Sequence, residues 1–222
     1  MDVSVFEVIG PIMIGPSSSH TAGAAKLARI AKDIVNASFN RVTFGLHGSF
    51  AMTYKGHGTD RALVAGVLGL YEDDEAIADS FELAKQQGLE YEFYEINLEN
   101  VHENTVKITF LLEDGSNYYV IGSSIGGGQI IITNMNGFQT EFTAQYSTIM
   151  MKHYDRYGIV SEVSAILANS HINIATMRLN RNARGEEAFC IIDTDDIVPY
   201  DVKECIEQLD GVIQVQVINV ND

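Results

Sequence analysis

The hydrophobic pattern of the last third of the chain alternates between the period of a strand and the period of a helix. Apolar residues at every second position indicate strands, and apolar residues three and four positions apart indicate helices. In order, the pattern predicts strand, helix, strand, strand, helix and strand. The expected strands are Ile149–His153, Ile172–Leu179, Glu186–Asp193 and Val212–Ile218, and the helical faces are Ile159, Val163, Ile166 and Leu167, then Val202, Cys205, Ile206 and Leu209. We therefore expect a βαββαβ domain over residues 147–222.

Two details of this domain predict local geometry. The parity of the apolar positions switches between Ile174 and Ala175, which predicts a β-bulge, because one extra residue returns the apolar side chains to the same face. The Ala188–Ile192 run is apolar at every position, so we expect it to form a central strand.

The first 145 residues combine the two periods in a different order. Three helical patterns and one short strand come first, and alternating apolar residues follow from Tyr91 onward. The expected helices cover about 24–36, 59–70 and 76–87, and the expected strands cover 41–46, 91–97, 105–112, 117–124, 129–134 and 138–144. Asp114-Gly115 and Asn136-Gly137 separate strand patterns and are typical of hairpin turns. We therefore expect an α+β fold, with an N-terminal α/β sandwich over residues 1–145 and a mainly antiparallel sheet.

The acidic composition argues against some partners. The chain has 14 Lys and Arg against 30 Asp and Glu, which gives a formal net charge of -16. This charge repels the phosphate backbone that dominates affinity for nucleic acids, so we expect no nucleic-acid partner. No apolar run approaches the roughly 18 residues of a membrane span, and the N-terminus lacks the pattern of a signal peptide. We therefore expect a cytoplasmic protein that does not bind membranes.

Cysteine is scarce in this sequence. Cys190 and Cys205 are its two cysteines, and both lie in the expected C-terminal domain. A disulfide framework needs more cysteines, and an iron–sulfur cluster is usually held by four thiolates. Any such cluster would have to be ligated mostly by another chain, and we expect no metal site in this chain.

Three polar, glycine-containing segments in the N-terminal part are candidates for ligand binding. They are GPSSSHT at 15–21, KGHGTD at 55–60 and SSIGGG at 123–128. At helix starts, such segments can place hydroxyl groups, imidazoles and free backbone N–H groups around one small anionic ligand. The alternative is that the serines only cap helices, the glycines only form turns, and His20 and His57 are ordinary polar residues. Two histidines flanked by residues suited to close ligand approach favour the first interpretation.

The remaining histidines are interpreted as structural. His47 ends a strand beside a glycine, and His102 lacks the HExxH spacing that places two zinc ligands on one helical face. His153 and His171 belong to the C-terminal domain.

Three stretches together resemble the beta chain of the iron–sulfur-dependent L-serine dehydratases, also called L-serine ammonia-lyases. These stretches are VFEVIGPIMIGPSSSHTAGAAKLARIA, YKGHGTDRALVAGVLG and SSIGGGQI. The resemblance spans the N-terminal domain. It implies conversion of L-serine to pyruvate and ammonia through aminoacrylate, and an alpha chain as partner. That alpha chain would bring a 4Fe-4S cluster whose iron acts as a Lewis acid on the serine hydroxyl.

The resemblance also implies a role for each candidate residue. His20 and His57 are the expected proton-transfer residues, because an imidazole titrates near neutral pH and removal of the serine α-proton needs a base. The expected substrate-binding residues are Ser17, Ser18, Ser19, Thr21, Gly126 and Gly127. Lys55, Asp60 and the 126–128 glycine run as a whole are weaker candidates than the histidines and the serines.

The C-terminal domain resembles an ACT domain through the stretches DRYGI at 155–159 and HINI at 171–174. ACT domains are ferredoxin-like modules that pair side by side and bind small effectors, commonly amino acids. Gly158 allows the backbone to approach a ligand, and the following helix start attracts a carboxylate. The expected effector-binding residues are Asp155, Gly158, Ile159 and Asn173. Self-pairing without an effector is the alternative.

Two other functions are compatible with the same motifs. In the first, the chain is a purely regulatory amino-acid-binding subunit with no catalytic residues. In the second, it is a pyridoxal-phosphate serine dehydratase in which Lys55 forms the Schiff base and the glycine run at 126–128 holds the phosphate. An N-terminal part of about 145 residues is short for the two lobes that normally enclose that cofactor, which argues against the second function.

Overall fold

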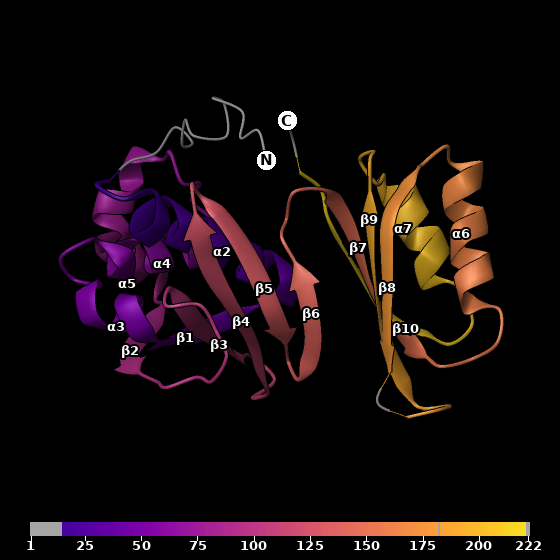
Figure 1. Cartoon of the computed structure of the whole chain (residues 1–222), viewed down its shortest axis with the longest axis horizontal. Helices are drawn as coiled ribbons and strands as arrows, with labels where there is room; N and C mark the ends of the chain where they lie inside the picture. The colour runs from indigo at the N-terminus through magenta and orange to yellow at the C-terminus, as the bar shows by residue number, and fades with distance from the viewer. Residues whose placement is uncertain (1–14, 182, 221–222) are drawn as a thin grey trace. The chain divides into compact units, whose positions relative to one another are not determined.

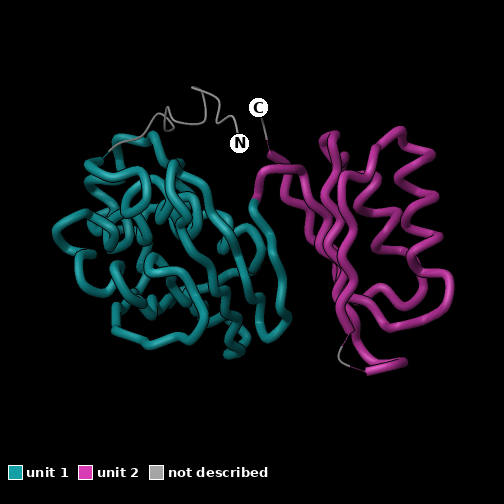
Figure 2. The backbone as a smooth tube through the Cα atoms, in the orientation of Figure 1, with its two compact units in different colours: residues 1–143 teal, residues 144–222 magenta. Residues whose placement is uncertain are grey.

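The computed structural model describes residues 15–181 and 183–220. The chain divides into two units, an N-terminal unit of residues 1–143 and a C-terminal unit of residues 144–222 (Figure 2). Each unit contains its own sheet and its own helices (Figure 1).

The N-terminal unit is built on a six-stranded sheet with the order β2-β1-β3-β4-β5-β6. β1 and β2 run parallel, whereas the other neighbouring pairs run antiparallel. The strands are β1 (Phe39–Leu46), β2 (Glu90–Glu95), β3 (Thr105–Leu112), β4 (Asn117–Gly126), β5 (Gln129–Met135) and β6 (Phe138–Phe142). The helices are η1 (Ser18–Ala22), α2 (Gly23–Val35), α3 (Gly48–Thr53), α4 (Thr59–Leu68), η2 (Glu75–Asp79) and α5 (Ser80–Gln87). The predicted α+β fold with a mainly antiparallel sheet is confirmed.

Helix α2 packs on the sheet because one of its faces is apolar. Its buried residues recur at helical spacing and include Ala24, Leu27, Ala28, Ala31, Ile34 and Val35. Helix α4 approaches α2 closely at Gly66, where an added Cβ would lie 2.3 Å from the carbonyl oxygen of Ala25. Both helices are followed by a residue in the left-handed conformation, Asn36 after α2 and Gly69 after α4. These caps end the two helices close to their expected limits.

The structure corrects the expected helices in three places. The helix expected over 76–87 consists of the 3-10 helix η2 followed by α5, because the Asp74 side chain accepts a hydrogen bond from the backbone N–H of Ala76 and starts a turn there. The short helix α3 follows β1, where no helix was expected. The first expected helix opens with η1, a π-helical turn, and Ser17 caps it. This cap confirms the predicted serine cap.

The C-terminal unit is the predicted βαββαβ domain. Its elements are β7 (Ser147–Tyr154), α6 (Ile159–Asn169), β8 (Ile174–Arg181), β9 (Glu187–Thr194), α7 (Tyr200–Glu207) and β10 (Val212–Ile218). The four strands form an antiparallel sheet with the order β10-β7-β9-β8, and α6 and α7 cover one face of it (Figure 1). The core between helices and sheet includes Ile149, Met151, Val163, Leu167, Cys190, Ile192, Val202, Ile206 and Val215.

The predicted β-bulge is confirmed in β8. The register between β8 and β9 shifts between Ile174 and Thr176. Ile174 and Met177 are an odd number of residues apart, so a regular strand would point them to opposite faces. Both pack against the same core, because the bulge restores the face. The central position of β9, flanked by β7 and β8, agrees with its continuous apolar run.

The helices of the described residues are short compared with a membrane span. The α2 helix has 13 residues, fewer than the about 20 that a membrane span needs. Within residues 15–181 and 183–220, no helix is long and apolar enough to cross a membrane.

Candidate active site

The serine-rich segment, Ser17–Thr21, forms the entry to helix α2. Ser17 has extended backbone angles, and its hydroxyl oxygen accepts a hydrogen bond of 3.1 Å from the backbone N–H of His20. This is the usual way in which a serine caps a helix start. Ser18, Ser19 and His20 are half-buried, and Thr21 is buried. The segment forms the π-helical turn η1, a rare conformation that is frequent at functional sites.

The structure brings the two predicted histidines together. The ring centroids of His20 and His57 lie 4.9 Å apart, with the ring planes tilted by 36°. His57 comes from the turn between α3 and α4, and its carbonyl oxygen accepts a 3.0 Å hydrogen bond from the Thr21 hydroxyl. This bond joins the serine-rich segment to the turn, and we call His20 and His57 the histidine pair. Because His57 is exposed, a ligand can reach the pair from solvent.

A residue that sequence reasoning missed completes the surroundings of His20. The Nε2 atom of His20 lies 3.0 Å from the Ser49 hydroxyl, and the Nδ1 atom lies 3.5 Å from the Ser17 hydroxyl. The Phe50 ring contacts the His20 ring edge-on, with centroids 5.4 Å apart. The available signal was Gly48-Ser49 directly after a strand, which repeats the glycine-plus-serine pattern of the other candidate segments.

The electrostatic surroundings keep His20 neutral. Burial lowers the pKa of His20 below its ordinary value of 6.5, and the neighbouring His57 lowers this pKa further. Two imidazolium ions at this distance would repel each other, and a buried charge is poorly solvated. Near neutral pH, His20 can therefore accept a proton.

The glycine turn at 126–128 joins β4 to β5, and all three glycines have positive φ. An added Cβ at Gly126 or Gly127 would meet no atom within 4 Å, so this turn borders open space. Ser124, in the same strand, contacts Gly23 at the start of α2. Through Ser124, the strand that carries this turn therefore contacts the start of α2, which follows the serine-rich segment.

The two weaker candidates have local roles. The Lys55 ammonium lies 5.5 Å from the centroid of the Tyr54 ring, a cation–π contact at the surface. A carboxylate oxygen of Asp60 accepts a hydrogen bond of 2.8 Å from the backbone N–H of Arg61, and burial raises the pKa of Asp60. A surface lysine above an aromatic ring gives no support to a Schiff-base function.

The predicted effector residues of the C-terminal unit do not form one cluster within that unit. β7 ends where Tyr154 pairs with Glu187, and β8 begins where Ile174 pairs with Thr194. Asp155 and Asn173 therefore lie at opposite ends of β9, roughly 20 Å apart at about 3.3 Å per residue. The sequence motifs around Asp155 and Asn173 could not reveal this separation, because the separation depends on the order of the strands in the sheet.

Each of the four effector candidates already has a structural role. Asp155 accepts hydrogen bonds from the Arg181 guanidinium at 2.6 Å and from the Gly185 N–H at 3.1 Å. These two donors, the Gly185 N–H first, lower the pKa of Asp155. Gly158 is the left-handed N-cap of α6, and Ile159 is buried in the core. Asn173 donates hydrogen bonds to the carboxylates of Asp195 and Asp196.

The described part of the chain does not offer a site for an iron–sulfur cluster. Within residues 15–181 and 183–220, no group of three or more His, Cys, Asp or Glu side chains is arranged to hold a metal ion. Cys190 is buried in the core of the C-terminal unit, and burial raises the pKa of its thiol to about 11. Cys205 lies exposed on α7.

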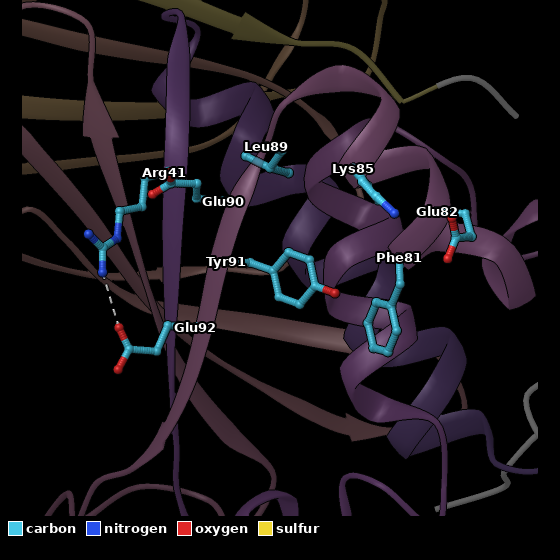
Figure 3. A pocket seen from close by; sticks show the side chains of 8 residues that line it. All are labelled: Arg41, Phe81, Glu82, Lys85, Leu89, Glu90, Tyr91 and Glu92. Atoms are coloured by element: carbon cyan, nitrogen blue, oxygen red, sulfur yellow. Dashed lines mark hydrogen bonds and ion pairs between the residues drawn. The ribbon is translucent and has the colours of Figure 1, made fainter.

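Two clefts occur elsewhere in the N-terminal unit. The larger, of about 680 Å³, lies between α5 and the outer strand β2 (Figure 3) and is lined by Arg41, Phe81, Glu82, Lys85, Leu89, Glu90, Tyr91 and Glu92. The other, of about 400 Å³, lies over β4, β5 and β6 and is lined in part by His102, Ser123 and Asn134. Neither lining includes the histidine pair or the serine-rich segment, and Ser123 in the smaller cleft is the first residue of the third candidate segment.

Comparisons with known proteins match both units. Residues 4–135 match the family described as serine dehydratase beta chain, and residues 147–211 match the ACT domain family. The chain is 50% identical over 206 residues to the L-serine dehydratase beta chain of Peptoniphilus asaccharolyticus, with 92% of this chain and 93% of that relative covered. The chain belongs to the serine dehydratase beta chain family. This membership confirms the resemblance found in the sequence.

One further relative agrees with the assignment, and a solved structure matches part of the C-terminal unit. The probable L-serine dehydratase beta chain of Bacillus subtilis (strain 168) is 40% identical over 212 residues, with 96% of each chain covered. The crystal structure of the ACT domain from the GTP pyrophosphokinase of Chlorobium tepidum covers 32% of this beta chain and 95% of that domain, with a TM-score of 0.28 and 17% identity. The serine-rich segment, His57 and the glycine turn all lie within the part matched to the beta chain family.

Proposed function

We propose that this beta chain assembles with an alpha chain into an L-serine dehydratase that converts L-serine to pyruvate and ammonia. The observation that carries the proposal is the histidine pair, which stands beside a serine-rich helix start in the part matched to the beta chain family. A neutral base next to free backbone N–H groups suits a substrate that has both an acidic α-proton and a carboxylate.

In this proposal, the start of η1, which leads into α2, binds the substrate carboxylate. Ser18 and Ser19 are half-buried in η1, where hydroxyl and backbone donors can point to an anion. The glycine turn at Gly126 and Gly127 completes the binding site, because its backbone borders open space. Ser17 and Thr21 hold the histidine pair through the two hydrogen bonds described above.

His20 is the proposed proton acceptor. Its lowered pKa keeps the imidazole neutral near pH 7, so it can take the α-proton of L-serine. The β-hydroxyl group leaves and combines with a proton as water, which gives 2-aminoacrylate. The imine form of this product then reacts with water and yields pyruvate and ammonia. His57 is the second proposed proton-transfer residue, because its exposed ring lies beside His20 and can supply the proton with which the hydroxyl group leaves as water.

The proposal places a 4Fe-4S cluster in the alpha chain. The described residues of the beta chain do not fit such a cluster, because Cys190 is buried in a core and Cys205 lies on a different element of the C-terminal unit. The contribution of the beta chain is therefore to bind the substrate and to move protons. The two free thiols agree with a reducing compartment, so a cytoplasmic location is part of the proposal.

The ACT unit is proposed to pair with a second ACT unit and to bind an amino-acid effector. Asp155 and Gly158 lie at one end of its sheet and Asn173 lies at the other. A ligand that uses both ends therefore needs residues from two copies. Pairing alone, without an effector, predicts the same dimer and no change in its stability when amino acids are added.

Anaerobic co-purification of the two chains tests the proposed function. We expect serine-dependent pyruvate formation and an iron–sulfur absorption band in the complex, and neither in the beta chain alone. The matched control is the alpha chain alone at the same iron content. Pyruvate formation by the beta chain alone, or an iron-loaded complex that does not turn over serine, would contradict the proposal.

A further inference from the structure

Ser49 is held in place through its backbone on both sides. Its backbone N–H donates to the carbonyl oxygen of Glu103 at 2.9 Å, and its carbonyl oxygen accepts from the Thr53 hydroxyl at 2.7 Å. The first bond connects α3 to the loop before β3, and the second lies within the helix. The position of the Ser49 backbone is therefore set by the loop before β3 and by α3 itself, and not by His20.

The Ser49 hydroxyl is the closest hydrogen-bonding group to the His20 ring. It lies 3.0 Å from Nε2, within the ordinary range for such a bond, whereas the Ser17 hydroxyl lies 3.5 Å from Nδ1. The Ser17 oxygen already accepts a hydrogen bond from the backbone N–H of His20, so its own proton is free to point toward Nδ1. When it does so, Nδ1 is an acceptor and Nε2 carries the ring proton.

We propose that Ser49 is a positioning residue that accepts a hydrogen bond from Nε2–H of His20 and so leaves Nδ1 as the basic nitrogen. In a neutral imidazole, the partner of one nitrogen decides which nitrogen carries the proton. The Nε2–H bond to Ser49 is present in the neutral ring and in the imidazolium ion, so the ring keeps its orientation while Nδ1 gains or loses a proton. This inference rests on the proposed role of His20 as proton acceptor.

A hydroxyl suits this task better than a carboxylate. A carboxylate beside the ring would favour the imidazolium ion and would raise the pKa of His20. The neutral Ser49 orients the ring without that effect, and Ser17 and Phe50, which also contact the ring, carry no charge. His57 is the titratable group that acts on His20, and it acts in the direction that keeps His20 neutral.

The first test is an NMR measurement on the full beta chain, which needs neither the alpha chain nor activity. Imidazole ¹⁵N shifts report the tautomer, and the His20→Asn variant identifies the His20 signals. We expect the Nε2–H tautomer in the wild type and in Ser49→Thr, and a mixture of tautomers in Ser49→Ala. A dominant Nδ1–H tautomer in the wild type, or an unchanged spectrum in Ser49→Ala, would overturn the inference.

The second test uses the reconstituted two-chain complex. Ser49→Ala should lower kcat by roughly tenfold to a hundredfold, because the base is misoriented, and should change KM by less than about twofold. Ser49→Thr keeps the hydroxyl and should restore most of kcat. Ser116→Ala is the control. It removes a serine hydroxyl in the turn between β3 and β4, where that hydroxyl donates a hydrogen bond to Asp114.

The two tests separate failure of this inference from failure of the proposed function. A complex that is inactive with wild-type beta chain refutes the dehydratase function, while the tautomer measurement still decides the role of Ser49. Should Ser49→Ala fail to fold, Ser49→Cys keeps the size of the side chain and replaces the hydroxyl by a weak acceptor. It should show the same mixture of tautomers, and a wild-type spectrum in that variant would count against the inference.

Discussion

Gly23 and Ser124 are in such close contact that a side chain at position 23 would clash with Ser124. An added Cβ at Gly23 would lie 2.0 Å from the Ser124 hydroxyl oxygen and 2.8 Å from the Ser124 Cβ. One helical turn further along α2, Leu27 occupies the space over Gly122, where an added Cβ would lie 2.6 Å from a Leu27 methyl group. Small residues on both elements therefore bring α2 close to β4, which fixes the serine-rich segment against the strand that carries the glycine turn.

Gly23→Ala should destabilise the N-terminal unit. The methyl group would overpack the contact with Ser124, and overpacking of this kind costs about 1–3 kcal/mol. Ser124→Gly should tolerate the methyl group, so the double variant should recover most of the loss. Urea unfolding of the single variants and of the double variant measures this coupling. Additive effects of the two substitutions would contradict the proposed contact.

The stability contributed by Asp155 should depend on pH. The Gly185 N–H and the Arg181 guanidinium lower the pKa of Asp155 below its ordinary value of 3.8. The folded state thus binds the proton less tightly than the unfolded state, so the contribution is fully present well above pH 3.8 and is lost as the pH falls below it. We expect Asp155→Asn to lower the melting temperature at pH 7 but to differ little from the wild type near pH 2.

Thermal unfolding of both proteins between pH 7 and pH 2 provides this measurement. Asp73→Asn, at an exposed position in the N-terminal unit, is the control for the loss of one carboxylate. A difference between wild type and Asp155→Asn that stays constant down to pH 2 would show that the effect does not come from the ionised carboxylate.

The two cysteines should differ strongly in reactivity. Cys205 is exposed, whereas Cys190 is buried and has a thiol pKa raised to about 11. Because the thiolate is the reactive form, a disulfide reagent at pH 8 should modify Cys205 at least roughly tenfold faster than Cys190 in the folded chain. Cys205→Ser should remove the fast reaction, and denaturation should expose Cys190. Fast labelling of folded Cys205→Ser would refute the burial of Cys190.

The C-terminal unit was predictable because its signals are local. Each strand and each helix has its own hydrophobic period, and even the bulge in β8 was predicted from the switch of apolar parity between Ile174 and Ala175. The separation of Asp155 from Asn173 was not predictable in this way. It follows from strand order, which depends on which strands pair across the sheet and not on any one segment.

The candidate site also combines features that local sequence predicts with features that depend on how distant segments pack. His20 and His57 could be found from the sequence, because each lies in a glycine-containing polar segment. That their rings lie 4.9 Å apart follows from the packing of η1 and the α3–α4 turn, which no local pattern shows. Ser49 was missed because it lies in α3, which has six residues and too few apolar positions to show a helical period. The parallel pairing of β1 with β2 was not predicted, because it depends on which strands lie next to each other in the sheet.

The most direct test of the central claim is the rate of pyruvate formation from L-serine by the reconstituted complex with variants of the histidine pair. His20→Asn and His57→Asn should each lower kcat by at least roughly a hundredfold, because the reaction loses its proton-transfer group. His171→Asn is the control, since His171 is exposed in the C-terminal unit and asparagine also suits its positive φ. Unchanged turnover in both variants, with only an altered dependence on serine concentration, would contradict the account and would identify the chain as a regulatory subunit.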